Sequence, residues 1–163
     1  MPKNNDSDNI AQNIGLPEYF LFQGQYQPNP WKHKVYSLED LQQLGEQDTP
    51  PQDYCLQVVG HAEPEDIKPW FAHHDVPAPT AVCIHFETFR DGRGYSLAKM
   101  LHREHWFTAD LLCSGDILVD QIFYLWRCGF EGFVLRQDQS VELAQKALKS
   151  FEHVYQPSAQ LMP

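Results

Sequence analysis

The chain lacks any long uninterrupted apolar stretch. None of its runs approaches the roughly 20 apolar residues that span a bilayer. No apolar run follows residues 1–6 either, so we expect neither a membrane helix nor a secretory signal. Basic side chains are also scarce, since 12 Lys and Arg stand against 22 Asp and Glu and give a formal net charge of −10. Nucleic-acid binding needs clustered basic side chains, and we therefore expect no nucleic-acid partner.

The four cysteines include no CxxC pair, which is the spacing of many metal and redox sites. Without a secretory signal, reduced thiols in a cytoplasm are the expected state. A length of 163 residues is typical of one domain with a real core, and a hydrophobic share of 42% excludes wholesale disorder. We therefore predict a cytoplasmic protein that does not contact a membrane.

Composition divides the chain into four segments. Residues 1–13 are polar and predict a disordered tail, and residues 14–52 predict an appendage and linker. Within that appendage, residues 19–22 are apolar enough for an edge strand, and Ser37 has the features of a helix N-cap. Residues 53–155 predict an α/β domain, and residues 156–163 a C-terminal tail.

The α/β domain alternates strands and helices. Apolar runs bounded by turn residues predict strands at 54–60, 81–89, 109–114 and 130–136. Helical spacing predicts helices at 64–73, 95–105, 116–128 and 140–151. Four βα units imply a mostly parallel sheet with right-handed crossovers, preceded by an irregular N-terminal segment. Four units are half of a closed (βα)8 barrel, so the sheet is either half-barrel-like or small and open.

One strand-to-helix turn carries the densest chemistry. It is residues 90–96, called the 90–96 turn below: Arg90, Asp91, Gly92, Arg93, Gly94, Tyr95 and Ser96. Its glycines allow a ligand to approach closely, and a helix start attracts anions. Its two arginines offer planar donors to sulfate, sulfite, phosphate or carboxylate. A structural alternative stays open, in which Asp91 pairs with one arginine and Ser96 only caps the helix.

A dinucleotide loop is a weaker interpretation of the same residues. Gly92 and Gly94 match the first two glycines of GxGxxG, but Leu97 stands where the third glycine would allow close helix packing. We therefore expect an oxyanion site here and not a pyrophosphate site.

A second polar group follows the next strand. Asp116 is the expected N-cap of a helix, although Asp116 or Asp120 is also the candidate general acid or base if the protein is an enzyme. Gln121 and Arg127 are candidate rim residues of the same site. The sequence assigns no cofactor.

Alternation along the strands places Cys83, His85 and Glu87 on one face. Cys55 and Cys113 are expected on the equivalent face of their own strands, and three thiols facing one way suit a soft metal. Buried cysteine is common as a small hydrophobe, so packing is the favoured interpretation and no metal site is predicted.

Three motifs in order resemble one known family. They are residues 89–98, 115–121 and 127–133. The family is the bacterial one catalogued as domain of unknown function 934, which carries the label "probable oxidoreductase involved in sulfite reduction". Its members commonly sit beside genes of assimilatory sulfite reduction and cysteine synthesis.

The resemblance implies a role in sulfur metabolism. On it we expect an accessory protein of assimilatory sulfite reduction that binds a small oxyanion or docks to sulfite reductase. One alternative is a small α/β enzyme, an oxidoreductase or other, with its substrate on the βα loops. Another is a non-catalytic interaction module that forms a homodimer through an exposed sheet edge.

Overall fold

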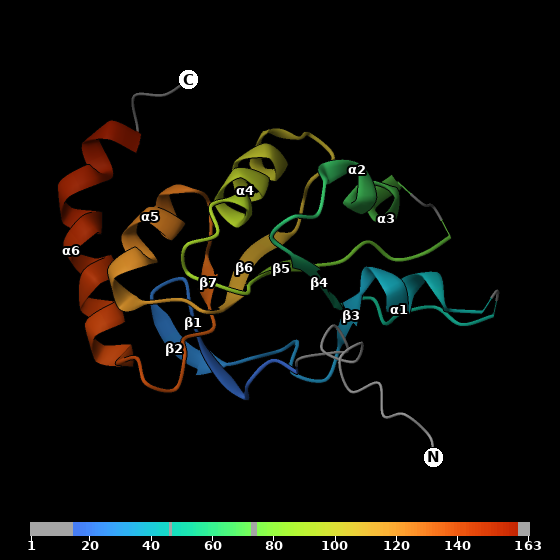
Figure 1. The fold of residues 1–163 in the computed structure, drawn as a ribbon, viewed down its shortest axis with the longest axis horizontal. Coiled ribbons are helices and arrows are strands. Elements are labelled where there is room, and N and C mark those ends of the chain that lie inside the picture. The colour runs from blue at the N-terminus through green and yellow to red at the C-terminus, as the bar shows by residue number, and fades with distance from the viewer. Residues whose placement is uncertain (1–14, 46, 73–74, 160–163) are drawn as a thin grey trace, which may run out of the picture.

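The fold is built on one mixed sheet. The computed structural model describes residues 15–45, 47–72 and 75–159. Seven strands form the sheet in the order β2-β1-β7-β6-β5-β4-β3 (Figure 1). Their bounds are β1 (Tyr19–Phe22), β2 (Gln25–Pro28), β3 (Val35–Ser37), β4 (Cys55–Val59), β5 (Ala81–Phe86), β6 (Asp110–Gly115) and β7 (Gly132–Phe133).

Strands β3 to β7 lie side by side in chain order, and each pairs in parallel with the next. Strands β1 and β2 form an antiparallel hairpin, and β1 adds that hairpin to the sheet antiparallel to β7. The expectation of an irregular N-terminal segment was therefore wrong for residues 15–45, which supply three strands. β1 is also not an edge strand, because it lies between β2 and β7 and buries both Phe20 and Leu21.

Helices follow the parallel strands. Their bounds are α1 (Leu38–Gln42), α2 (Pro64–Ile67), α3 (Pro69–Ala72), α4 (Arg93–Arg103), the 3-10 turn η1 (Val119–Gln121), α5 (Ile122–Arg127) and α6 (Val141–Ala159). Right-handed crossovers between strands added in one direction place their helices on one face of a sheet. Figure 1 shows α2 to α6 along the same side of the strands. Within the described ranges, no helix combines the length and the apolar character that crossing a bilayer requires.

Several helix and strand ends differ from the sequence-based expectation. Ser37 caps α1 as expected, because its hydroxyl accepts the N–H of Asp40 at 3.0 Å. Helix α6 continues to Ala159, so the expected tail from residue 156 begins inside a helix. β7 contains two residues instead of the seven expected at 130–136. The expected tail at residues 1–13 lies outside the described residues.

The face of the sheet toward the helices holds the main core. On β5 this face carries Val82, Ile84 and Phe86, which belong to one buried cluster with Leu97 and Leu101 of α4. All five side chains are no more than 3% exposed. This packing holds α4, and with it the 90–96 turn at its start, against the end of β5.

The opposite face is called the helix-free face below. There Cys55 and Cys83 pack with Phe20, Trp31 and other side chains in a second cluster. The register pairs Ile84 with Cys113, so Cys113 points toward the helices, away from the other two thiols. The expectation of three thiols on one face was therefore wrong. No group of three or more His, Cys, Asp or Glu in the part of the chain that the structure describes is placed to hold a metal ion.

Candidate functional site

The loops that leave the parallel strands meet at one edge of the sheet, called the carboxyl edge below. The loop after β5 leads into the 90–96 turn, the loop after β6 begins at Asp116, and the loop after β7 carries Arg136 and Asp138. Because β5, β6 and β7 are neighbours in the sheet, these three loops are also neighbours. Parallel α/β proteins place their binding sites at this edge.

The 90–96 turn is organised around an ion pair. The Arg93 guanidinium donates from Nε to Oδ1 of Asp91 at 2.9 Å and from Nη2 to Oδ2 at 2.7 Å. The backbone N–H of Arg93 donates to Oδ1 of Asp91 at 3.1 Å. These hydrogen bonds to Arg93 lower the pKa of Asp91 to about 2. A charged carboxylate therefore occupies the start of α4, where the helix dipole favours an anion.

The other polar side chains of the turn make looser contacts. The Arg90 guanidinium lies 5.4 Å from the centre of the Phe89 ring, and no described carboxylate pairs with it. The Ser96 hydroxyl donates to the carbonyl of Gly92 at 3.4 Å and does not cap the helix. The turn thus keeps one arginine in an internal ion pair and presents the other at the surface.

The two glycines of the turn have different roles. A Cβ placed on Gly94 would lie 2.5 Å from Cε1 of Phe86, so Gly94 lets the aromatic ring of β5 approach the helix. Gly60, at the end of β4, lies against the backbone of Gly94 in the same way. Gly92 has an ordinary helical conformation with open space around its Cα. Close packing within the protein accounts for Gly94, and only Gly92 faces open space.

Asp116 ties the neighbouring loops together. Its Oδ2 accepts the backbone N–H of Phe89 at 2.9 Å, and its Oδ1 accepts Nη1 of Arg136 at 2.5 Å. The expectation that Asp116 caps a helix was wrong, because the helical segment starts at Val119 and the carboxylate faces the loops after β5 and β7. The Phe89 N–H and then the Arg136 guanidinium lower the pKa of Asp116, so the carboxylate is held in its charged form.

The remaining candidate residues lie at different places. Gln121 donates from Nε2 to the carbonyl of Phe89 at 2.9 Å, so it and Asp116 hold the same residue, just before the 90–96 turn. Asp120 is exposed in η1, and the structure gives it no hydrogen bond or ion pair to a described residue. Arg127 ends α5 at the far end from Gln121 and lies over the ring of Phe123, with 5.7 Å to the ring centre. The structure therefore brings Asp116 and Gln121, but not Arg127, to the turn.

A polar relay lies on the helix-free face near the carboxyl edge. The Cys83 thiol donates to Oγ of Ser114 at 3.4 Å, and Nδ1 of His85 lies 3.1 Å from the same oxygen. Burial raises the pKa of Cys83 to about 12, which keeps the thiol protonated. Burial also lowers the pKa of His85, while the nearby Glu87 opposes that shift. A protonated thiol and a neutral imidazole suit hydrogen bonding better than nucleophilic attack.

Sequence reasoning missed three of these residues. Arg136 and Asp138 resemble ordinary loop residues in the sequence, yet the Arg136 guanidinium bridges the carboxylates of Asp116 and Asp138. Ser114 is the last residue of the strand expected at 109–114, and the β5–β6 register places it beside His85. The available signal was alternation, since Ser114 is the polar residue that continues the face of Leu112.

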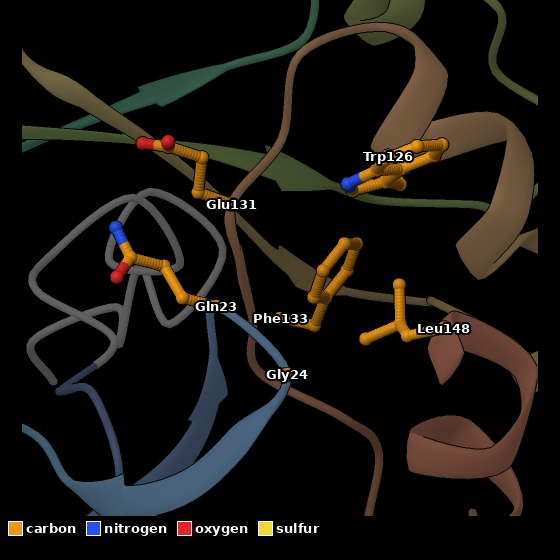
Figure 2. A pocket seen from close by; sticks show the side chains of 6 residues that line it. All are labelled: Gln23, Gly24, Trp126, Glu131, Phe133 and Leu148. Carbon is orange, nitrogen blue, oxygen red and sulfur yellow. The ribbon is translucent and has the colours of Figure 1, made fainter. Parts of the chain in front are cut away.

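The structure also contains a pocket away from these loops. It has a volume of about 210 Å³ and is lined by Gln23, Gly24, Trp126, Glu131, Phe133 and Leu148 (Figure 2). Figure 2 shows the Glu131 carboxylate directed away from Trp126 and Leu148. Burial, and then the neighbouring Asp110, raises the pKa of Glu131. Glu131 precedes β7 and Asp110 begins β6, so this pocket lies at the end of the sheet opposite the carboxyl edge.

Comparison with known proteins identifies a family without a known function. A family model described as "Bacterial protein of unknown function (DUF934)" matches residues 58–162. No curated protein and no solved structure matches the chain. The matched range contains β5, β6, β7, the 90–96 turn and Asp116, and it covers more than half of the chain. The chain therefore belongs to this family of bacterial proteins of unknown function.

Proposed function

We propose that the protein binds a small oxyanion at the 90–96 turn and serves as an accessory protein of assimilatory sulfite reduction. The position of Asp91 carries the proposal. Its carboxylate receives both a helix-start N–H and a forked guanidinium, which are the contacts that an external oxyanion makes at such sites. Asp91 is thus an internal occupant of an anion site.

An external oxyanion can replace this occupant because the ion pair is open to solvent. The Arg93 side chain is 62% exposed, and exposed ion pairs contribute little to stability. Arg90 lies in the same turn, and its guanidinium faces an aromatic ring instead of a described carboxylate. Two guanidinium groups and one N–H together match the three oxygens of sulfite or the four of sulfate.

The choice of sulfur oxyanions as the ligands rests on the family resemblance and on the chemistry of the turn. Sulfite, sulfate and phosphate present the same kind of oxygens to a guanidinium fork. The resemblance to proteins labelled for sulfite reduction favours sulfite among them. We propose a cytoplasmic protein with sulfite reductase as its partner and with no cofactor of its own assigned.

A binding role fits the carboxyl edge better than acid–base catalysis does. A general base near neutral pH needs a pKa close to the working pH. The pKa of Asp116 is lowered instead, because Phe89 and Arg136 hold its charged form. Asp120 lies exposed, without a hydrogen bond or ion pair to a described residue. An α/β enzyme remains the alternative to test, and turnover of sulfite by the purified protein alone would support it.

Isothermal titration tests the binding proposal. We expect heat with at least one of sulfite, sulfate and phosphate, and sulfite should bind most tightly. Arg93→Ala should remove the signal because it removes the fork. Arg103→Ala is the matched control, since Arg103 is an exposed arginine at the other end of α4. Absence of heat with all three anions, or equal loss in both variants, would contradict the proposal.

A pull-down tests the docking part separately. The full-length chain, immobilised, should retain purified sulfite reductase at moderate salt. Retention that persists in Arg93→Ala would assign docking to another surface while leaving the anion site in place. No retention under any salt condition would remove the partnership.

A homodimer is a second candidate, favoured by one edge of the sheet. Strand β2 is an outer strand, and Tyr26 on it stacks with Tyr19 of β1 at 5.8 Å between ring centres. Tyr19 and Tyr26 are 48% and 51% exposed, so the hairpin offers aromatic surface beside the outer edge of β2. Light scattering coupled to size exclusion should then give twice the mass of 18.9 kDa. A monomer at all concentrations would remove this candidate.

A further inference from the structure

Helices α4 and α5 carry charge of only one sign. Together they hold four of the 12 Lys and Arg of the chain and none of its 22 Asp and Glu. The chain as a whole has a formal net charge of −10. The two helices therefore present a basic surface on an acidic protein.

The basic side chains gather where the two helices meet. Nζ of Lys99 donates to the Tyr124 hydroxyl at 3.0 Å and lies 5.1 Å from the centre of the same ring. Arg103 follows Lys99 one helical turn later, and its positive charge opposes the rise in the Lys99 pKa that this hydroxyl causes. Burial raises the pKa of Cys128, and the charges of Lys99 and Arg127 oppose that rise, so both cations lie near this thiol. Lys99, Arg103, Tyr124 and Arg127 are called the α4–α5 face below.

Two cations of this face are not neutralised by the protein itself. In the part of the chain that the structure describes, neither Lys99 nor Arg103 forms an ion pair with a carboxylate. Glu104 follows Arg103 directly, but it lies beyond the end of α4 and pairs with neither cation. By contrast, four other described cations each pair with a carboxylate: Lys32, Lys34, Arg93 and Arg136. The α4–α5 face thus keeps positive charge available to a carboxylate from outside.

Aromatic rings hold the cations of the face in place. Lys99 lies against Tyr124, and the Arg127 guanidinium lies over Phe123 with 5.7 Å to the ring centre. The Tyr124 side chain is itself 48% exposed. Tyrosine and arginine are enriched at protein interfaces, and side chains that are already held lose less freedom when a partner binds. The face therefore has the composition and the order of a docking surface.

The charge of the face selects the kind of partner. Three cations neutralise few phosphates, and a net charge of −10 repels nucleic acid. A second copy of the chain related by a two-fold axis would bring the same cations together, and like charges repel. A different protein that carries carboxylates on its surface would instead be attracted.

We propose that the α4–α5 face docks a partner protein through carboxylates on the surface of that partner. The proposal rests on the proposed function only for the identity of the partner, sulfite reductase. It uses none of the residues of the oxyanion site, so binding of sulfite at the 90–96 turn and docking at the α4–α5 face can fail separately.

Biolayer interferometry with purified sulfite reductase tests the proposal. The full-length chain should bind more weakly as the NaCl concentration rises, because salt screens the charges. Lys99→Gln/Arg103→Gln should weaken binding several-fold, and Lys99→Glu/Arg103→Glu should weaken it at least about tenfold. Lys146→Glu/Lys149→Glu is the matched control, since it reverses two exposed charges on α6 and should weaken binding by less than about twofold.

Carbodiimide cross-linking locates the contact directly. The reagent joins lysine amines to carboxylates that touch them, so mass spectrometry should find Lys99 joined to an Asp or Glu of the reductase. Lys99→Arg keeps the charge and removes the amine, and it should therefore retain binding and lose this cross-link.

The outcomes separate the face from the partnership. Equal weakening in the α4–α5 and α6 variants would overturn the assignment of the face and leave the partnership intact. A wild-type chain that binds no reductase at any salt concentration would overturn both. If light scattering shows that Lys99→Glu/Arg103→Glu converts a dimer into a monomer, the face belongs to a second copy of the chain and the proposal is overturned.

Discussion

Asp91 and Asp116 occupy comparable positions at the carboxyl edge, yet they hold different parts of the molecule. Each stands next to a glycine, and each accepts one backbone N–H and one arginine. Both partners of Asp91 belong to Arg93, two residues away. The partners of Asp116 are 27 and 20 residues away, in the loops after β5 and β7.

The difference separates a contact within one turn from a contact between loops. Releasing Asp91 changes only its own turn, because Phe86 and the core still hold Gly94 and α4. Releasing Asp116 frees the loop after β5 and the Arg136 guanidinium at once. The same chemistry therefore closes a single turn in one loop and ties two loops together in the other.

The glycines beside the two aspartates should give the largest contrast. Gly115 has a φ of +92°, and a Cβ there would lie 2.2 Å from the carbonyl oxygen of Phe86. Gly115→Ala should lower the free energy of unfolding by about 3 kcal/mol or more, because backbone strain and overlap add. Gly92→Ala is the matched control, since Gly92 has a φ of −72° and open space. Urea denaturation measures both, and equal losses would contradict the contrast.

Removal of the carboxylates should give the next largest contrast. Asp116→Ala should lower the urea midpoint more than Asp91→Ala, because it leaves both the Phe89 N–H and the Arg136 guanidinium without their acceptor. Hydrogen exchange provides a local readout. The Phe89 amide should exchange faster in Asp116→Ala and unchanged in Asp91→Ala. Equal exchange in the two variants would remove the structural role assigned to Asp116.

Unfolding at low pH should reveal the contribution of Asp91 to folding stability, which we expect to be smaller than that of Asp116. Its pKa in the folded state is about 2, below the ordinary value of 3.8, so the native state binds fewer protons than the unfolded state between these values. The stabilisation of the folded state by the charged Asp91 carboxylate is present above about pH 4 and is lost as the pH falls toward about 2. Asp91→Asn should therefore lose less stability than the wild type over this range, as measured by urea midpoints. An identical loss in both proteins would place the acid sensitivity elsewhere.

The sequence predicts those strands whose own residues form a distinctive apolar pattern. The strand expected at 54–60 is β4 (Cys55–Val59), and the one expected at 109–114 is β6 (Asp110–Gly115), because buried apolar runs between turn residues are distinctive. Strands β2 and β3 have four and three residues, too few for a pattern. β2 forms through hairpin pairing with β1 across the turn at Gln23 and Gly24, whereas β3 forms through pairing with β4, which is distant in the sequence.

The candidate site shows the same limit: a contact between residues close in the sequence can be predicted, and a contact between distant residues cannot. The Asp91–Arg93 pair spans two residues, so this contact was recognisable from the sequence. The contact between Asp116 and Arg136 crosses 20 residues and requires two loops to meet. The contact between His85 and Ser114 depends on the register of β5 against β6. Local spacing predicts neither of these two contacts.

The central proposal is that the Asp91 carboxylate lies where an external oxyanion binds. Asp91→Asn tests this proposal most directly. Asparagine is close to aspartate in shape and lacks the charge that competes for Arg93. Titration calorimetry with sulfite should show tighter binding to Asp91→Asn than to the wild type, because the ligand no longer displaces an anion. Weaker binding to Asp91→Asn, or no heat with either protein, would contradict the claim and leave the Asp91–Arg93 pair as a structural feature of the turn.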